Sequence, residues 1–202
     1  MTLGDIFSGP AGSTNLTEDE KEGLIPSAII ARSELNEAEQ ANILQASIWL
    51  DRSSVRIEQL LTAKQLKAIH GRMFGHVWKW AKKFRRTGKN IGVDWWDIST
   101  QLDSLCADTL TQIRDSSKSR WPSDEIAIRF HHRLVQIHPF VNGNGRHARL
   151  VTDKLLRLLG EEEFTWGSGT IGKDGDARSN YIQALQAADN HDLTALLRFA
   201  RG

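Results

Sequence analysis

Residues 138–149, with the sequence HPFVNGNGRHAR, restrict the structure of this chain more than any other stretch of it. Pro139 cannot continue a helix and disfavours the α conformation at the preceding residue, so His138 is expected at a helix end with its imidazole presented. Gly143 and Gly145 permit left-handed backbone angles, and such angles let successive N–H groups turn toward one anion. The stretch therefore predicts an anion-binding turn between two helices.

Two arginines follow the turn, on a segment whose apolar pattern predicts a helix over about 145–159. Arg146 and Arg149 are three residues apart and share one side of the first helical turn, where guanidinium groups can hold phosphate oxygens. The N–H groups and the positive dipole end of the helix face the same point. Asn142, just before the turn, offers an amide oxygen to a metal or a ribose. A His-Pro pair or a Gly-Asn-Gly turn alone commonly just ends one helix and starts another, but together with both arginines it indicates a phosphate site beside a titratable base.

This stretch resembles the signature of the Fic family of nucleotidyl transferases, His-x-Phe-x-(Asp/Glu)-Gly-Asn-Gly-Arg-x-x-Arg. It matches at every defined position except Asn142, where the family has an acidic residue. The family resemblance covers about residues 35–202, and the whole chain also resembles the subgroup of that family called mobile mystery protein B. The resemblance implies an all-α fold, a Fic-type helical bundle with a small β-hairpin flap, and we expect the Fic domain to span residues 33–202.

The activity implied by the resemblance is transfer of AMP from ATP to a Ser, Thr or Tyr hydroxyl of a target protein, with release of pyrophosphate and with self-modification as a further outcome. His138 would act as the catalytic base. The ATP and its phosphates would be bound by Asn142, Gly143, Asn144, Gly145, Arg146 and Arg149. Mg²⁺ would accompany ATP, with Asn142 as a weak candidate ligand, since a neutral amide lacks the charge of a carboxylate. Two alternatives are a Fic-fold transferase with another phosphate-containing donor and a catalytically weak, nucleotide-binding regulatory module.

Residues 85–97 differ in character from the helical pattern around them, because glycines interrupt them and β-branched residues recur. They predict a short β-hairpin. In the family such a hairpin is a flap that lays the target segment beside the active site, and the corresponding residues here are Gly88, Lys89, Asn90 and Ile91. The basic cluster around this segment would alternatively be a nucleic-acid patch with Trp95 and Trp96 as stacking platforms, although its composition is more typical of a solvated face.

An inhibitory helix is a further expectation from the resemblance. Many Fic proteins carry (Ser/Thr)-x-x-x-Glu-(Gly/Asn) on a helix whose glutamate pairs with the second arginine of the signature. Ser33 and Glu37 fit this pattern, whereas Ala38 departs from it at the sixth position. Glu37 is therefore the candidate inhibitory residue, with Arg149 as its partner; alternatively, Glu37 only complements the dipole near a helix start.

The remaining chain organises around these elements. Residues 1–32 are rich in Gly, Ser, Thr and acidic residues and predict an extended arm with a short helix near 17–22. Apolar residues at helical spacing predict further helices that start at Ser33, near residue 62, over about 98–115 and from Ser123 to the 138–149 stretch, with one or two more over 178–199. Residues 167–174 nearly match a phosphate-binding Walker loop, but Asp174 replaces its hydroxyl residue, so we interpret them as a mobile loop.

Charge and cysteine content narrow the class of protein. Lys and Arg total 26 against 25 acidic residues, a net charge of +1 that argues against a general nucleic-acid or membrane-surface binder. Cys106, the one cysteine, lies on an apolar stripe and predicts a core residue in a reducing compartment. Neither a leader pattern nor an apolar stretch long enough to span a membrane is visible, so we expect a cytoplasmic protein. The sequence leaves the oligomeric state open.

Overall fold

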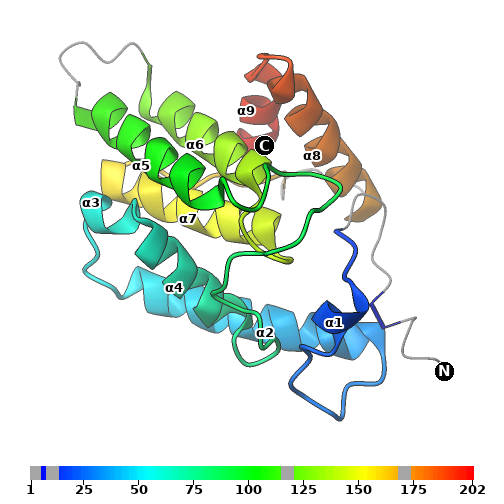
Figure 1. The fold of residues 1–202 in the computed structure, drawn as a ribbon. Helices are drawn as coiled ribbons and strands as arrows, with labels where there is room; N and C mark the ends of the chain where they lie inside the picture. The colour runs from blue at the N-terminus through cyan, green and yellow to red at the C-terminus, as the bar shows by residue number, and fades with distance from the viewer. Residues whose placement is uncertain (1–5, 8–13, 115–120, 168–173) are drawn as a thin grey trace.

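The computed structural model describes residues 6–7, 14–114, 121–167 and 174–202, so the expected loop at 116–120 and most of the Walker-like stretch lie outside the described residues. In the described part of the chain every regular element is a helix (Figure 1), which confirms the all-α class. The helices are α1 Glu18–Lys21, α2 Arg32–Asp51, α3 Ile57–Leu60, α4 Ala63–Phe74, α5 Ile98–Arg114, α6 Ser123–Ile137, α7 Asn144–Leu159, α8 Asp174–Asp189 and α9 Thr194–Arg201.

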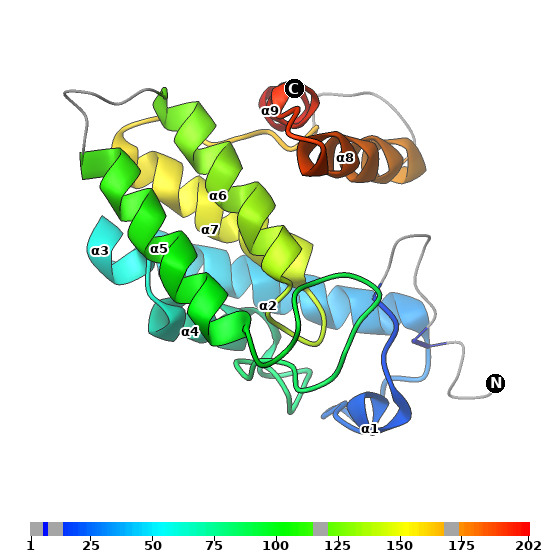
Figure 2. The ribbon, with the colours of Figure 1, turned by 45° about the horizontal axis from the view of Figure 1, so that its top comes forward.

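Helix α7 is the central element of the bundle. Ala148, Val151 and Leu155 recur every three or four residues and are fully buried, which gives α7 a continuous apolar face. Figure 2 shows α7 beside α6, with α5 flanking α6 and with α2 and α4 on the opposite side. Gly160 ends α7 in the left-handed conformation expected of a C-terminal cap. The 138–149 stretch joins α6 to α7 and is thus mounted on two packed helices.

Helix α2 presents one edge to α4 and α7. Its buried residues are Leu35, Glu39, Asn42, Ala46 and Leu50, spaced by three or four positions. This edge contains a buried carboxylate, that of Glu39. Glu37 lies two positions away, a rotation of about 200° around the helix axis, and its side chain is exposed.

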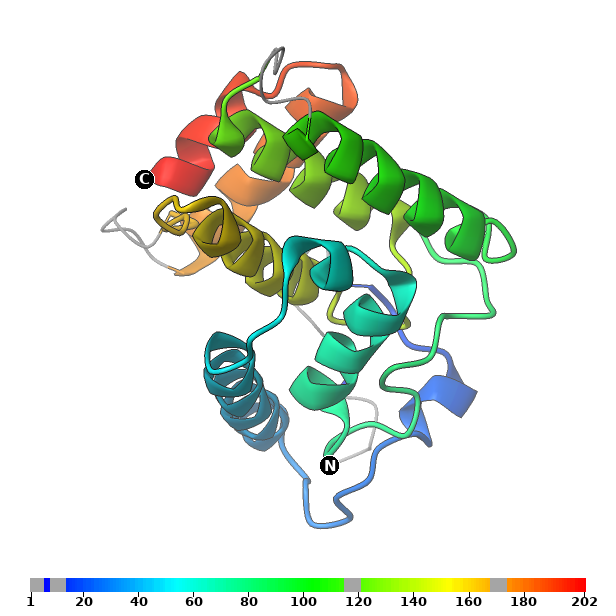
Figure 3. The ribbon, with the colours of Figure 1, turned by 90° about the vertical axis from the view of Figure 1, so that its left-hand side faces the viewer.

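The N-terminal arm packs against the connection between α4 and α5 (Figure 3). Thr17 caps α1 in a capping box with Glu20, which confirms the short helix expected there. An antiparallel bridge between Leu24 and Trp78 then attaches the arm to the segment after α4. The arm is thereby held over the side of the bundle that carries the 138–149 stretch.

The β-hairpin expected within residues 85–97 is not formed; the segment is an irregular loop, and no strand occurs in it. The reason is the side chain of Arg85, which is 2% exposed and donates to the carbonyls of Thr87 and Val93. A guanidinium group thus satisfies backbone acceptors that a β-ladder would otherwise use. Helix α4 ends at Phe74 with Gly75 as its C-cap, and Val77 and Trp80 are buried in the turns that follow. The short α3 was not predicted.

Cys106 is buried in α5, and burial raises the pKa of its thiol to about 12, which agrees with a core role. Among the helices of the described ranges, none combines the length and the apolarity that a bilayer crossing requires.

Candidate active site

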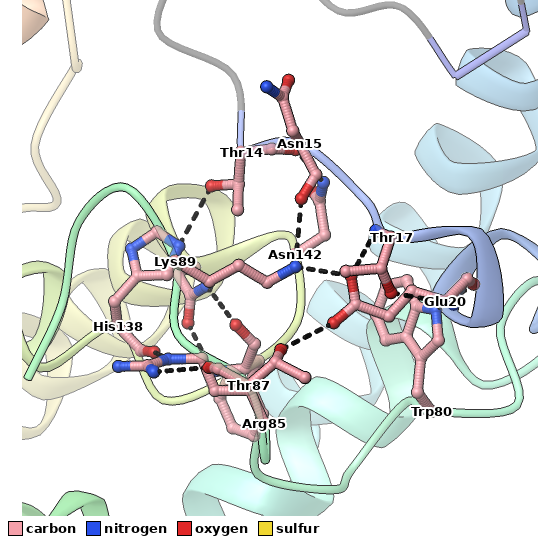
Figure 4. Close-up of polar contacts among 12 residues, drawn as sticks. Thr14, Asn15, Thr17, Glu20, Trp80, Arg85, Thr87, Lys89, His138 and Asn142 are labelled. Atoms are coloured by element: carbon pink, nitrogen blue, oxygen red, sulfur yellow. Dashed lines mark hydrogen bonds and ion pairs between the residues drawn. The ribbon is translucent and has the colours of Figure 1, made fainter. Parts of the chain in front are cut away.

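His138 ends α6 in the left-handed conformation, with φ 51° and ψ 59°. Because this backbone turn takes the residue off the helix, the side chain is aimed at the N-terminal arm, as Figure 4 shows. The imidazole is 4% exposed, and its Nε2 lies 3.1 Å from the hydroxyl oxygen of Thr14. In the tautomer with the proton on Nδ1, the Thr14 hydroxyl donates to Nε2. The base candidate therefore already faces a hydroxyl group.

Burial, together with the positive charges of Arg85 and Lys89, lowers the pKa of His138 to about 4, against an opposite effect of the Val135 carbonyl. The imidazole is consequently neutral at pH 7. In the tautomer with the proton on Nδ1, Nε2 carries the lone pair that a general base needs.

Arg85 fixes the backbone on which His138 stands. Its Nε donates to the His138 carbonyl at 2.7 Å, and the far end of the guanidinium reaches the Ile137 carbonyl at 3.4 Å. The same group holds Thr87 and Val93, as described above, so one side chain connects the end of α6 with the 85–97 loop (Figure 4). Arg85 is therefore a structural clamp rather than part of an exposed basic patch.

The turn between α6 and α7 has the backbone expected of an anion site. Gly143 has φ 79°, and an added Cβ would meet the Phe74 ring at 2.5 Å, so only glycine fits there. Asn144 brackets the backbone of Phe140, accepting from its N–H and donating to its carbonyl, both at 2.9 Å. The first N–H groups of α7 have no acceptor within the helix and point out of this rigid turn.

His70 supports the turn from below and was not recognised from the sequence. The Lys82 N–H donates to its Nδ1 at 3.1 Å, so its Nε2 carries the proton and donates to the Asn142 carbonyl at 3.0 Å. Its ring stacks on Phe140 with centroids 3.7 Å apart. Burial lowers the His70 pKa well below its ordinary range, which keeps this hydrogen-bond pattern intact at neutral pH.

The two arginines of α7 are engaged differently. Arg146 pairs with the Glu39 carboxylate at 2.5 Å and lies over the Phe74 ring. Arg149 lies over the ring of Tyr181, whose hydroxyl is hydrogen-bonded to His131 at 2.9 Å. Tyr181 thus lies beside the first turn of α7, near Gly145.

The expected pairing of Glu37 with Arg149 is not present. Glu37 is exposed. The carboxylate that reaches the site is that of Glu39, on the other face of α2, and its partner is Arg146. Trp78 Nε1 also donates a hydrogen bond to the Glu39 carboxylate at 2.7 Å. The prediction was wrong in register because the Ser-x-x-x-Glu pattern does not say which residues of α2 face the core.

Asn142 does not make a protein-held magnesium site by itself. Its Oδ1 accepts the Gly143 N–H at 2.6 Å and its Nδ2 donates to the Thr14 carbonyl at 3.3 Å. Within the described residues no group of three or more His, Cys, Asp or Glu is placed to hold a metal ion. A single amide oxygen does not fit Mg²⁺, which prefers carboxylate or phosphate oxygens.

The four expected flap residues lie on the loop above the site. Gly88, Asn90 and Ile91 are exposed, whereas Lys89 folds back onto the arm, donating to the Asn15 carbonyl at 3.0 Å and pairing with Glu20. The nucleic-acid alternative loses two of its cations, since Arg85 and Lys89 are committed to these internal contacts.

A family model described as Fic/DOC family matches residues 60–156. A protein adenylyltransferase Fic of Culex quinquefasciatus is 29% identical over 152 residues, which cover 75% of this chain and 29% of that protein. The protein of the same name from Drosophila grimshawi is 31% identical over 141 residues, 69% of this chain and 28% of the relative. The chain spans less than a third of these relatives.

A crystal structure of BepC, a VirB-translocated effector of Bartonella tribocorum with bound AMPPNP, shares the fold. The TM-score is 0.67 at 18% identity, and the match covers 92% of this chain and 97% of that one.

Proposed function

The chain belongs to the Fic/DOC family, and from this premise we propose that it is a protein adenylyltransferase, which moves AMP from ATP to a Ser, Thr or Tyr hydroxyl. The observation that carries the proposal is the 3.1 Å contact between His138 Nε2 and a hydroxyl oxygen, in the stretch that joins α6 to α7; the lowered pKa of His138 agrees with it. The curated relatives are named for this activity, and the BepC structure holds an ATP analogue.

In the proposed reaction a target hydroxyl takes the place next to His138. Nε2 accepts its proton while the oxygen attacks the α-phosphorus of ATP, and the bond to the bridging oxygen breaks so that pyrophosphate leaves. The N–H groups of Asn144 and Gly145 at the start of α7 would hold the phosphates, joined by that of Gly143 once it is released from Asn142 Oδ1. Arg149 and, once released from Glu39, Arg146 would neutralise the charge of the departing group.

Two parts of the sequence-based expectation stay within this proposal. We take residues 33–202 as the Fic domain and residues 1–32 as its arm, and we keep the assignment to the subgroup called mobile mystery protein B. Mg²⁺ would arrive on the oxygen atoms of ATP, since the described residues hold no group of three or more His, Cys, Asp or Glu that could bind the ion.

A second candidate is a regulatory module that binds a nucleotide without transferring it. The neutral Asn142 in the acidic position and the engagement of Arg146 by Glu39 both favour this alternative. A Fic-fold transferase with another phosphate-containing donor would differ from the adenylyltransferase and from the regulatory module in the donor molecule that it uses.

The test is labelling of proteins from α-phosphate-labelled ATP by the purified chain, with His138→Ala as the variant. A positioned general base contributes about 10²- to 10⁴-fold, so this substitution should remove label transfer while calorimetry shows ATP affinity within a few-fold of wild type. His76→Ala, at an exposed histidine after α4, is the matched control and should label normally. Equal labelling by His138→Ala would exclude the mechanism, and ATP binding without any transfer by wild type would favour the regulatory module.

A further inference from the structure

The residue that occupies the place of the target hydroxyl belongs to the chain itself. We propose that Thr14 is a self-modification site, adenylylated by His138 of the same chain. This inference rests on the proposed function and names a substrate for it. Its starting point is the 3.1 Å contact between the Thr14 hydroxyl oxygen and His138 Nε2 (Figure 4).

The arm is held by contacts on both sides of Thr14. Asn142 Nδ2 donates to the Thr14 carbonyl at 3.3 Å, and Lys89 Nζ donates to the next carbonyl, that of Asn15, at 3.0 Å. Two neighbouring backbone carbonyls are thus bound, one by the 138–149 stretch and one by the 85–97 loop. Backbone contacts of this kind hold an extended segment in a defined register without selecting its side chains.

Glu20 sets that register from a distance. Its carboxylate pairs with Lys89, and these two side chains are only 10% and 4% exposed. Thr87 donates to the same carboxylate at 3.1 Å, and Trp80 Nε1 donates to the Glu20 carbonyl at 3.1 Å. Thr14 lies six positions before Glu20 in the chain. Because Glu20 fixes α1 to the loop, the segment that precedes α1 places Thr14 at the imidazole of His138.

The other hydroxyl groups near this point are already used. Thr17 Oγ1 accepts the Glu20 N–H at 3.3 Å as the cap of α1, and the Thr87 hydroxyl donates to Glu20. Among the described residues, Thr14 is the hydroxyl that contacts His138. The contact therefore selects one residue for modification.

The reaction balances as a simple group transfer. The Thr14 oxygen forms a bond to the α-phosphorus of ATP, its proton moves to His138 Nε2, and the bond from that phosphorus to the bridging oxygen breaks. The products are AMP-Thr14, pyrophosphate and one proton, which the imidazole returns to solvent. Because nucleophile and base lie on one chain, the step is unimolecular, and tethering supplies a high effective concentration of the hydroxyl.

The first experiment maps the label. The full chain is incubated with α-phosphate-labelled ATP, and the modified peptide is identified by mass spectrometry. Thr14→Ser should keep the label, Thr14→Val should lose it, and Thr111→Val, at an exposed threonine of α5, should be labelled like wild type. Label on another residue, or undiminished label on Thr14→Val, overturns the proposal.

The second experiment tests whether His138 acts within its own chain. The labelled fraction should grow at a rate that does not depend on protein concentration. In a mixture of His138→Ala and Thr14→Val chains, neither should become labelled at Thr14. Transfer to the His138→Ala chain by its partner would overturn self-modification within one chain.

The same incubations include cell extract, which separates this proposal from the proposed function. If extract proteins are labelled while Thr14 is not, the Thr14 assignment alone fails. If neither the extract proteins nor the chain are labelled by wild type, adenylyl transfer itself fails, and the assignment fails with it.

Discussion

The ion pair between Glu39 and Arg146 should restrain nucleotide binding, and Glu39→Gln tests this. The pair has a distance of 2.5 Å, and the Glu39 side chain is 7% exposed against 34% for Arg146. Glutamine keeps an oxygen that can accept from Trp78 Nε1, as Glu39 does now at 2.7 Å. The substitution therefore removes the charge while it preserves the shape and the second hydrogen bond.

The magnitude follows from replacing a charge-assisted hydrogen bond with a neutral one. Such an exchange costs about 1–2 kcal/mol of folding free energy, and the partial exposure of Arg146 keeps it toward the lower end. For a domain of this size, roughly 2–4 °C of Tm correspond to each kcal/mol, so Tm should fall by about 2–8 °C. Because Arg146 is then free for phosphate, the same free energy should tighten ATP binding by roughly 5- to 30-fold.

The assay combines a melting curve with calorimetric titration of ATP. Glu37→Gln is the matched control, since it is the same substitution on the same helix at an exposed position, and it should change neither quantity measurably. A lower Tm together with tighter ATP binding is the expected signature of Glu39→Gln. Unchanged or weaker ATP binding would refute the argument, and an effect of Glu37→Gln equal to that of Glu39→Gln would restore the sequence-based assignment.

Three further predictions concern Asn142 and pH. Asn142→Asp adds the missing carboxylate, so it should lower the magnesium concentration needed for half-maximal transfer by roughly tenfold and speed transfer. The substitution also places an oxygen against the Thr14 carbonyl, which Nδ2 now contacts at 3.3 Å. An unmoved magnesium titration would contradict this prediction. Because the pKa of His138 is about 4, transfer should stay constant from pH 7 to about pH 5 and decline near pH 4, whereas a decline near pH 6.5 would show that the imidazole is not held neutral. Between about pH 6.5 and pH 4 the unfolded chain binds protons at His138 and His147 that the folded chain does not. Acidification over this range should therefore lower the free energy of unfolding by up to roughly 3 kcal/mol for each of these residues. Burial raises the pKa of Asp153 to about 7, so Asp153 has the opposite effect, and urea titrations at several pH values measure the balance.

Local sequence patterns were enough to predict the central part of the structure. The helix end at His138, the glycine turn and the apolar face of α7 were predicted because Pro139, Gly143 and the spacing of Ala148, Val151 and Leu155 act on their own neighbourhood in the chain.

Contacts between distant segments were not predictable in the same way. Thr14 and His138 are 124 positions apart, and nothing in the composition of the arm indicates that it crosses the site. Glu39 was missed because the facing edge of α2 depends on where α4 and α7 pack. The hairpin was predicted from β-branched residues, but a buried guanidinium took the backbone acceptors, and a charged residue in a basic cluster gives no sign that it will be buried.

The clamp formed by Arg85 has a consequence for protein engineering. Its carbonyl partners Thr87 and Val93 stand at the two ends of the loop, so the guanidinium group holds both ends of the loop, its frame, in place. Gly92 belongs to the frame, because an added Cβ would come within 2.8 Å of the His138 Cβ, whereas Gly88 has open space around it. We therefore expect that residues 88–91 can be replaced by other loop sequences. A library of loops grafted there would vary which segment is held over His138 and would leave His138 itself in place.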